Sequence, residues 1–159
     1  MADTSDGFIY GLDKFSFGGK VFGYISEEGM TPGGSTATKT QIRAAQAGNA
    51  VVKTLVTTPA TKTFTFALIQ LKTGTFVDVF GGEVDANGVY SAPAREKVLE
   101  DSAKIECVSG HVIDIAKASL TPSLAGAINL ADVLRISCEL EMLVPDDNES
   151  PYQITPPIA

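Results

Sequence analysis

The stretch KTFTFALIQLK, residues 62–72, carries the clearest structural pattern in this chain of 159 residues. Large apolar side chains alternate with small or polar ones, with Phe64, Phe66 and Leu68 set against Thr63, Thr65 and Ala67. Successive residues of an extended chain point to opposite faces, so this period of two predicts a strand with one face in a core. The chain is therefore expected to be built around a sheet.

Further strands are predicted on both sides of this stretch. Aromatic, β-branched or alternating runs place them at 8–17, 20–25, 36–45, 50–58, 103–109, 111–120 and 133–144. Turns between them are indicated by Gly18-Gly19, residues 46–49, Asn87-Gly88 and Gly110. The run at 36–45 contains QIRAA, which also suits a helix, but its threonines and its neighbour at 50–58 favour a hairpin.

Three segments interrupt the strand pattern. Residues 26–35, SEEGMTPGGS, are rich in glycine and are predicted as a loop. Residues 94–101 suit either a helix or a loop. Pro122 is expected to begin an irregular stretch over 121–132, because proline is disfavoured inside a sheet.

A short helix is predicted at 75–80. Thr73 or Thr75 is its expected cap, and Gly81-Gly82 its expected end. Together with the strands, this makes the fold class mainly β, an antiparallel β-sandwich or barrel with one or two short helices.

The length fits one domain, residues 1–159, with a folded core over 7–144. The first six residues, MADTSD, are polar and are expected to fray. Residues 145–159 hold four of the eight prolines and are predicted as an extended arm.

The composition argues against several classes of protein. The net charge is −7, and an acidic chain does not bind phosphates, so specific nucleic-acid binding is not expected. No leader and no apolar run of membrane-spanning length is present, which predicts a protein made and kept in the cytoplasm or assembled there, with no membrane partner. Only 19% of residues are charged, against roughly 25% in soluble domains, which leans towards surface covered by a partner.

Candidate catalytic and ligand residues do not form a motif. Glu27-Glu28 are adjacent and would point to opposite faces of an extended chain. The single histidine, His111, has no nucleophile motif beside it. Gly33-Gly34 before STATKT lacks the spacing of a phosphate loop, and residues 85–88 lack the further ligands of a calcium loop.

The two cysteines, Cys107 and Cys138, lie in apolar or alternating segments and are predicted to be reduced core thiols, although a disulfide between neighbouring strands stays open. No cysteine or histidine cluster suits zinc. The sequence therefore predicts no catalytic residues, no cofactor-binding residues, no metal site and no cofactor, which indicates a protein that is not an enzyme.

The order of the segments resembles the major tail-tube proteins of long-tailed, non-contractile bacteriophages (siphophages), in particular those of actinobacterial hosts. The resemblance covers residues 8–82. It rests on GYISEEG at 23–29, AVVKTLVTT at 50–58, TFTFALIQ at 63–70 and the apolar helix ending FVDVFG at 76–81. This chain departs from that family at Ala45, where a tryptophan is common.

The resemblance implies a structural virion protein. Its subunits would form hexameric rings that stack into the tail tube, through which genomic DNA passes during ejection without specific binding. Other expected partners are the tape measure, tail terminator and distal tail proteins, and the expected location is the tail of the virion after assembly in the host cytoplasm. Alternatives are another phage structural protein, such as a contractile-system tube or decoration protein, and a soluble ligand-binding β-domain or enzyme.

Head-to-tail contacts between subunits are expected at residues 26–35, 36–58 and 145–159. The lumen of the tube is expected to be net negative, so that a duplex slides without sticking. The alternative is that the acids only keep the outer surface soluble. A lumen lined mainly by Lys53, Lys62 and Lys72 would contradict the sliding hypothesis.

Overall fold

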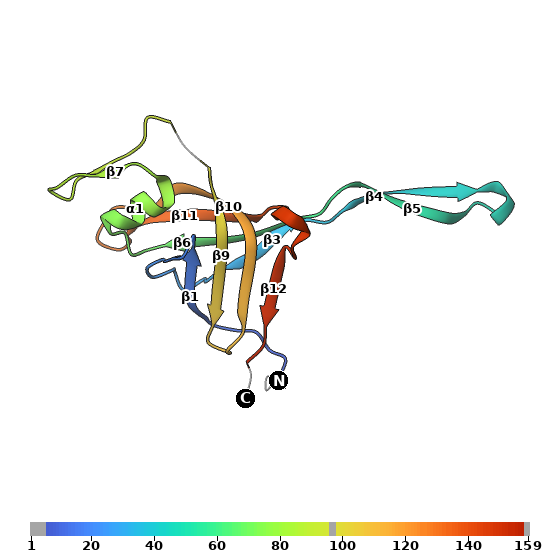
Figure 1. The fold of residues 1–159 in the computed structure, drawn as a ribbon, viewed down its shortest axis with the longest axis horizontal. Helices are drawn as coiled ribbons and strands as arrows, with labels where there is room; N and C mark the ends of the chain where they lie inside the picture. Colours follow the sequence, from blue (N-terminus) through green and yellow to red (C-terminus); the bar gives the residue numbers. More distant parts are fainter. Residues whose placement is uncertain (1–5, 96–97, 158–159) are drawn as a thin grey trace.

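The computed structural model describes residues 6–95 and 98–157, and there the chain is mainly β and antiparallel, as the sequence predicts (Figure 1). The main sheet has the order β2-β1-β9-β10-β11-β6-β3, and β12 pairs with β10 beside this path. Its strands are β1 (Leu12–Phe17), β2 (Lys20–Val21), β3 (Thr31–Ser35), β6 (Thr61–Leu68), β9 (Leu99–Cys107), β10 (Val112–Gly126), β11 (Leu134–Met142) and β12 (Tyr152–Thr155). Separate hairpins are formed by β4 (Thr38–Ala44) with β5 (Ala50–Thr58), and by β7 (Glu83–Val84) with β8 (Tyr90–Ser91).

The main sheet curls over on itself and encloses the core. Strands β1 and β6 have β9, β10 and β11 between them in the sheet, yet the rings of Phe15 and Phe66 lie 4.9 Å apart. The inward positions of β6 are those that alternate in sequence, and Phe66 and Leu68 pair with Cys138 and Ile136 of β11. All four of these side chains are buried, which confirms the predicted sandwich.

Strand β10 forms the corner of the sandwich. Its first part, Val112–Ile115, pairs with both β9 and β12, and the part from Ala118 onward pairs with β11. A register shift lies between Ile115 and Ala118 in the pairing with β9. Such an irregularity bends a strand, and this allows one strand to serve both halves of the sandwich.

The expectation that Pro122 begins an irregular stretch is wrong for residues 121–126. Strand β10 continues through Pro122, which pairs with Cys138, and ends at Gly126. The reason lies on the other side of the strand, where the pairing with β9 stops at Leu120. A proline is tolerated there because an edge position does not need its backbone N–H for a ladder.

The predicted helix is present as α1 (Thr73–Phe80), two residues longer at its start than expected. It ends at Gly81, as predicted, but its cap is Lys72 and no side chain caps it, so the expected threonine cap is wrong. Val79 is fully buried against the core. The Asn-Gly hairpin β7–β8 packs on the helix, since the rings of Phe76 and Tyr90 stack at 5.2 Å.

Other boundaries differ from the expectation. The loop predicted at 26–35 ends at Met30, because Thr31–Ser35 forms β3 on the edge of the sheet beside β6. The strand predicted at 20–25 is reduced to the two residues of β2. Of the segment 94–101, Glu96 and Lys97 lie outside the described residues, and β9 begins at Leu99, so its last three residues are neither helix nor loop.

The C-terminal segment is extended and returns to the body. After a 3₁₀ turn η2 (Asp146–Asn148), residues Tyr152–Thr155 pair antiparallel with Ile115–Val112 of β10. Positions 1–5, which were predicted to fray, lie outside the described residues. So do positions 158–159, the last two of the predicted C-terminal extension 145–159. The first and last described parts of the chain lie on the same side of the body in Figure 1.

Candidate assembly surfaces

The residues considered for catalysis do not come together. His111 is buried at the turn between β9 and β10, and its Nδ1 lies 3.0 Å from the Ser109 hydroxyl. Gly33 and Gly34 are strand residues of β3, paired with Thr63 and Lys62, and do not form a phosphate loop. In the part of the chain that the structure describes, no cluster of three or more histidine, cysteine, aspartate or glutamate residues could hold a metal ion.

The acidic turn residues have local structural roles. The Asp85 carboxylate accepts the backbone N–H groups of Asn87 and Val89, both at 2.9 Å, and so closes the β7–β8 turn. Both members of the Glu27-Glu28 pair are exposed, and Glu28 lies 4.0 Å from the Arg135 guanidinium. The carboxylates of Asp85 and Glu28 therefore support a turn and a loop.

Both cysteines are free thiols, as expected. Cys138 is 1% exposed in the core, and burial raises its pKa to about 12. Cys107 is half-buried at the end of β9, and burial raises its pKa as well. A raised pKa disfavours the thiolate, which is the reactive form, so neither thiol is activated as a nucleophile.

A long hairpin leaves the body of the molecule. We call β4, β5 and the 3₁₀ turn η1 (Ala45–Ala47) between them the arm, residues 38–58; it is the predicted 36–58 hairpin, and it extends far to the right in Figure 1. It continues the β3–β6 pair outward, and all of its residues except Ala44 are exposed. Its exposed large aliphatic side chains are Ile42, Val51, Val52, Leu55 and Val56.

The arm is also the basic part of an acidic protein. Between Glu28 and Asp78 the sequence holds five cations and no anion: Lys39, Arg43, Lys53, Lys62 and Lys72. Since the whole chain carries −7, the remainder without these +5 carries −12. Three of the five cations belong to the arm itself. The arm therefore carries a local charge of +3, in contrast to the net negative charge of the whole chain.

The outward face of β10, β11, β6 and β3 is composed of small polar residues, and we call it the Ser/Thr face. Register places its side chains in rows across the four strands, as the pairs of β11 with both neighbours show. The rows are Ser119–Glu141–Thr63–Gly33, Thr121–Glu139–Thr65–Thr31 and Ser123–Ser137–Ala67. No aromatic or large aliphatic side chain interrupts them.

The charges in these three rows are acidic, and the cation Arg135 lies beyond them, where it pairs with Ala125. Glu139 and Glu141 lie at the centre of the Ser/Thr face on β11, and Glu100 of β9 continues one row beyond Ser119. None of the three lysines named against the sliding hypothesis belongs to these rows. Lys53 is on the arm, and Lys72 caps α1. Lys62 has the opposite side-chain parity, and its Nζ lies 4.6 Å from the centre of the Tyr152 ring.

A second apolar surface lies in the loop between β10 and β11, at the end of the body opposite to the arm (Figure 1). We call residues 127–133 the tip. Leu130 is fully exposed and Ile128 is 83% exposed, with Val133 and the neighbouring Leu124 also exposed. The sequence pattern did not single out these residues, because the stretch was expected to be irregular.

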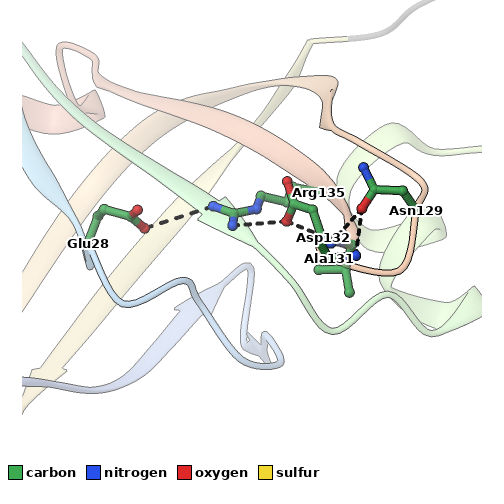
Figure 2. A network of polar contacts seen from close by, with 6 residues as sticks. Glu28, Asn129, Ala131, Asp132 and Arg135 are labelled. Carbon is green, nitrogen blue, oxygen red and sulfur yellow. Dashed lines mark hydrogen bonds and ion pairs between the residues drawn. The ribbon is translucent and has the colours of Figure 1, made fainter.

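The tip is held in one shape by polar contacts, which Figure 2 shows. The Asn129 side-chain oxygen accepts the backbone N–H groups of Ala131 (2.8 Å) and Asp132 (2.7 Å). The guanidinium of Arg135 lies 3.2 Å from the Asp132 carboxylate and 4.0 Å from that of Glu28. Arg135 therefore joins the tip to the 26–30 turn.

Two carboxylates, Asp132 of the tip and Glu28 of the neighbouring turn, stay ionised. A hydrogen bond from the Ser26 side chain, a backbone hydrogen bond and, less, Arg135 hold the pKa of Glu28 below its ordinary value. The backbone N–H of Val133 does the same for the pKa of Asp132, again with help from Arg135. Two carboxylates, Glu28 and Asp132, and the one guanidinium of Arg135 thus form the charged group at the tip.

Several sheet edges are left without a partner strand in the described residues. Strand β3 pairs with β6 on one side only, and β10 has no neighbour beyond Leu120 on the side of β9. The two edges flank the four strands of the Ser/Thr face. Unpaired edges offer backbone donors and acceptors to another chain.

The three segments expected at subunit contacts thus occupy different positions in the structure. The arm projects from the body, and 26–35 supplies both an edge strand and the acidic turn beside the tip. The segment 145–159 covers β10 of its own chain through β12. The Ser/Thr face and the tip were not predicted. The absence of acids from 29 to 77 was a signal in the sequence for the basic arm.

No protein-family model and no curated protein matches this chain at a significant level. Among the described residues, no helix has the length and apolar character needed to cross a membrane.

Proposed function

We propose that this chain is a self-assembling structural subunit, the tail-tube protein of a long-tailed phage. Its hexameric rings stack into a tube that conducts DNA. The observation that carries the proposal is the arm, a hairpin that leaves the body with aliphatic residues on its surface. An isolated two-stranded hairpin is marginally stable in water, so we expect this hairpin to pack against the surface of a partner.

The arm explains how one ring can hold the next. An extension of this length reaches beyond the body that carries it, and its aliphatic side chains gain about 25 cal/mol per Å² when they are covered. We expect the arm to bind a different surface on the neighbouring subunit. Such a contact is head-to-tail, and it can repeat indefinitely. A stacked tube is one such open assembly.

The Ser/Thr face supports a lumen inside the ring. Four strands from each of six subunits give about 24 strands, and at 4.7 Å spacing with about 40° tilt the backbone diameter is roughly 45 Å. A duplex passes through such a barrel. Side chains with hydroxyl groups keep the wall wet, and its carboxylates repel phosphate, so DNA slides without specific binding.

The open edges of β3 and β10 support closure of the ring. In a monomer each leaves backbone groups to water, and in a closed barrel each would pair with the next subunit. The two edges are offset along the strand direction, because β3 lies beside the Thr61 end of β6 and the free part of β10 lies towards its Leu68 end. Such an offset is what tilted strands need in order to close.

Within this proposal, the remaining partners are proteins that bind at the ends of the tube or lie inside it. Tape measure, terminator and distal tail proteins would meet it there, and the location is the virion tail after assembly in the host cytoplasm. No catalytic step is assigned.

Electron microscopy of the purified full chain tests the proposal. The expected result is hollow tubes or stacked rings of uniform width. A variant in which a two-residue turn replaces residues 38–58 should stay folded, with a circular dichroism spectrum that is still β-rich, and lose the tubes. A chain that stays monomeric at every concentration and salt tested, with a ligand in its interior, would refute the proposal.

A further inference from the structure

The tip is an exposed apolar surface that its own chain does not use. Leu130 and Ile128 point away from the body, at 110% and 83% exposure. Single exposed aliphatic residues are ordinary, but several on one short loop mark an interaction site. Neither the proposed tube nor the arm by itself explains why this loop is apolar.

The shape of the tip is fixed before any partner arrives. Gly126, at the entrance of the loop, has φ +77°, and a Cβ there would lie 2.7 Å from the Val133 carbonyl oxygen. Asn129, Asp132 and Arg135 then tie the loop internally and to the body. A loop that is already ordered loses little conformational entropy on binding, so its aliphatic side chains contribute nearly all of their burial to affinity.

The charges around the tip select the occupant. Glu28 and Asp132 outweigh Arg135 by one charge, so the surroundings of the tip are net negative. A matching partner must be both aliphatic and basic. The arm of this same protein has that character, with five exposed aliphatic residues among three cations and no anion.

The register of the arm puts both characters on each of its faces. One face presents Ile42 and Leu55 with Lys53, and the other presents Val51 and Val56 with Lys39 and Arg43. Whichever face turns towards a neighbour therefore offers aliphatic contact and positive charge together. Apolar contact gives affinity, and the charges steer the two surfaces into register.

The positions of the two surfaces make this contact intermolecular. The arm continues from the Thr61 end of β6, whereas the tip adjoins the Leu68 end, since Leu134–Ile136 of β11 lie beside Leu68. The eight residues of β6 separate them by about 25 Å of strand. The two surfaces lie at opposite ends of the molecule in Figure 1. One chain cannot bring its own arm to its own tip.

We propose that the tip, residues 127–133 with Leu124 and the carboxylates beside it, is the docking site for the arm of a second copy of this chain. The inference rests on the proposed self-assembly and names the surface that receives the arm. It makes each subunit a donor at one end and an acceptor at the other. The contact is heterologous, so the assembly grows with a fixed polarity.

Assembly of tip variants gives the first test. The variant Ile128→Ser/Leu130→Ser should raise the concentration needed for assembly of the full chain at least about tenfold, which corresponds to about 1.4 kcal/mol. The matched control is Val108→Ser, an exposed valine on the turn between β9 and β10, which should leave that concentration unchanged. Wild-type assembly combined with normal assembly of the tip variant would overturn the inference and leave the proposed function standing.

Cross-linking gives a second test that does not depend on tubes. Chains with Leu130→Cys and chains with Val52→Cys, both in a Cys107→Ala background, are mixed and treated with a short bismaleimide. Cross-linked pairs of the two different chains are expected, and Leu130→Cys mixed with Val108→Cys should give none. Cross-links without tubes would support the docking and refute the tube; tubes without this cross-link, or cross-links only between two Leu130→Cys chains, would refute the docking.

Discussion

Reversal of the charge on the Ser/Thr face tests the sliding hypothesis directly. In the variant Glu139→Lys/Glu141→Lys, two central carboxylates of β11 become ammonium groups. A ring of six subunits then presents about 12 lysines to a duplex where it presented about 12 carboxylates. Both side chains lie on the outward side of the sheet, so the core should not change.

The size of the effect follows from counterion release. If about half of these lysines contact phosphates, roughly six contacts form per ring. With six such contacts, the affinity for DNA should fall by about 10³-fold between 50 and 200 mM salt. The expected signature is therefore DNA that is retained strongly at low salt and released at moderate salt. Wild-type tubes should retain no DNA at either concentration.

The assay is co-sedimentation of tubes assembled in the presence of a short labelled duplex. Because the reversal could weaken assembly, the variant is also co-assembled as a minority with the wild type. The control, Glu83→Lys/Glu106→Lys, makes the same change of net charge away from the Ser/Thr face. Tubes of the Glu139→Lys/Glu141→Lys variant that retain no more DNA than wild type, or control tubes that retain as much, would refute the assignment of this face to the lumen.

Four further results are expected. Replacing Cys138 by Ala should lower the free energy of unfolding by about 1–2 kcal/mol, with normal assembly. The buried thiol also makes the protein pH-sensitive: its pKa is raised from 9.0 to about 12, so the unfolded chain loses its proton first, and stability should fall by about 1.4 kcal/mol per pH unit between those values, a slope that Cys138→Ala abolishes in denaturant titrations. Deleting 145–159 removes β12 from β10 and the Lys62–Tyr152 contact, so the body should remain folded with a lower thermal midpoint and assemble poorly; normal assembly would exclude a role for this segment between subunits. Arg135→Gln should speed hydrogen exchange of the Ala131 and Asp132 amides, which Arg43→Gln on the arm should leave unchanged; equal rates in both variants would mean that Arg135 does not hold the tip.

The sequence by itself determined the fold class, because alternation is a local property. The pattern of Phe64, Phe66 and Leu68 fixes which side of β6 is buried whatever its neighbours are, and β11 follows in the same way. Asn87-Gly88, Gly18-Gly19 and Gly110 marked turns correctly, since positive φ is a requirement of the backbone at that point. The arm hairpin was predictable from its β-branched residues and its turn, and the free state of both cysteines from the apolar or alternating segments that hold them.

Only the tertiary structure decided which surfaces are left open. The Ser/Thr face exists because register brings Glu139, Thr65 and Thr121 into one row, and a slip of one residue would have turned them inward. Pro122 is tolerated in a strand because β9 begins only at Leu99, which pairs with Leu120, and this is a fact about a neighbour distant in sequence. The tip and the arm lie at opposite ends of the molecule because they adjoin opposite ends of β6. Long-range pairing sets these positions, and no local pattern encodes which strand lies beside which.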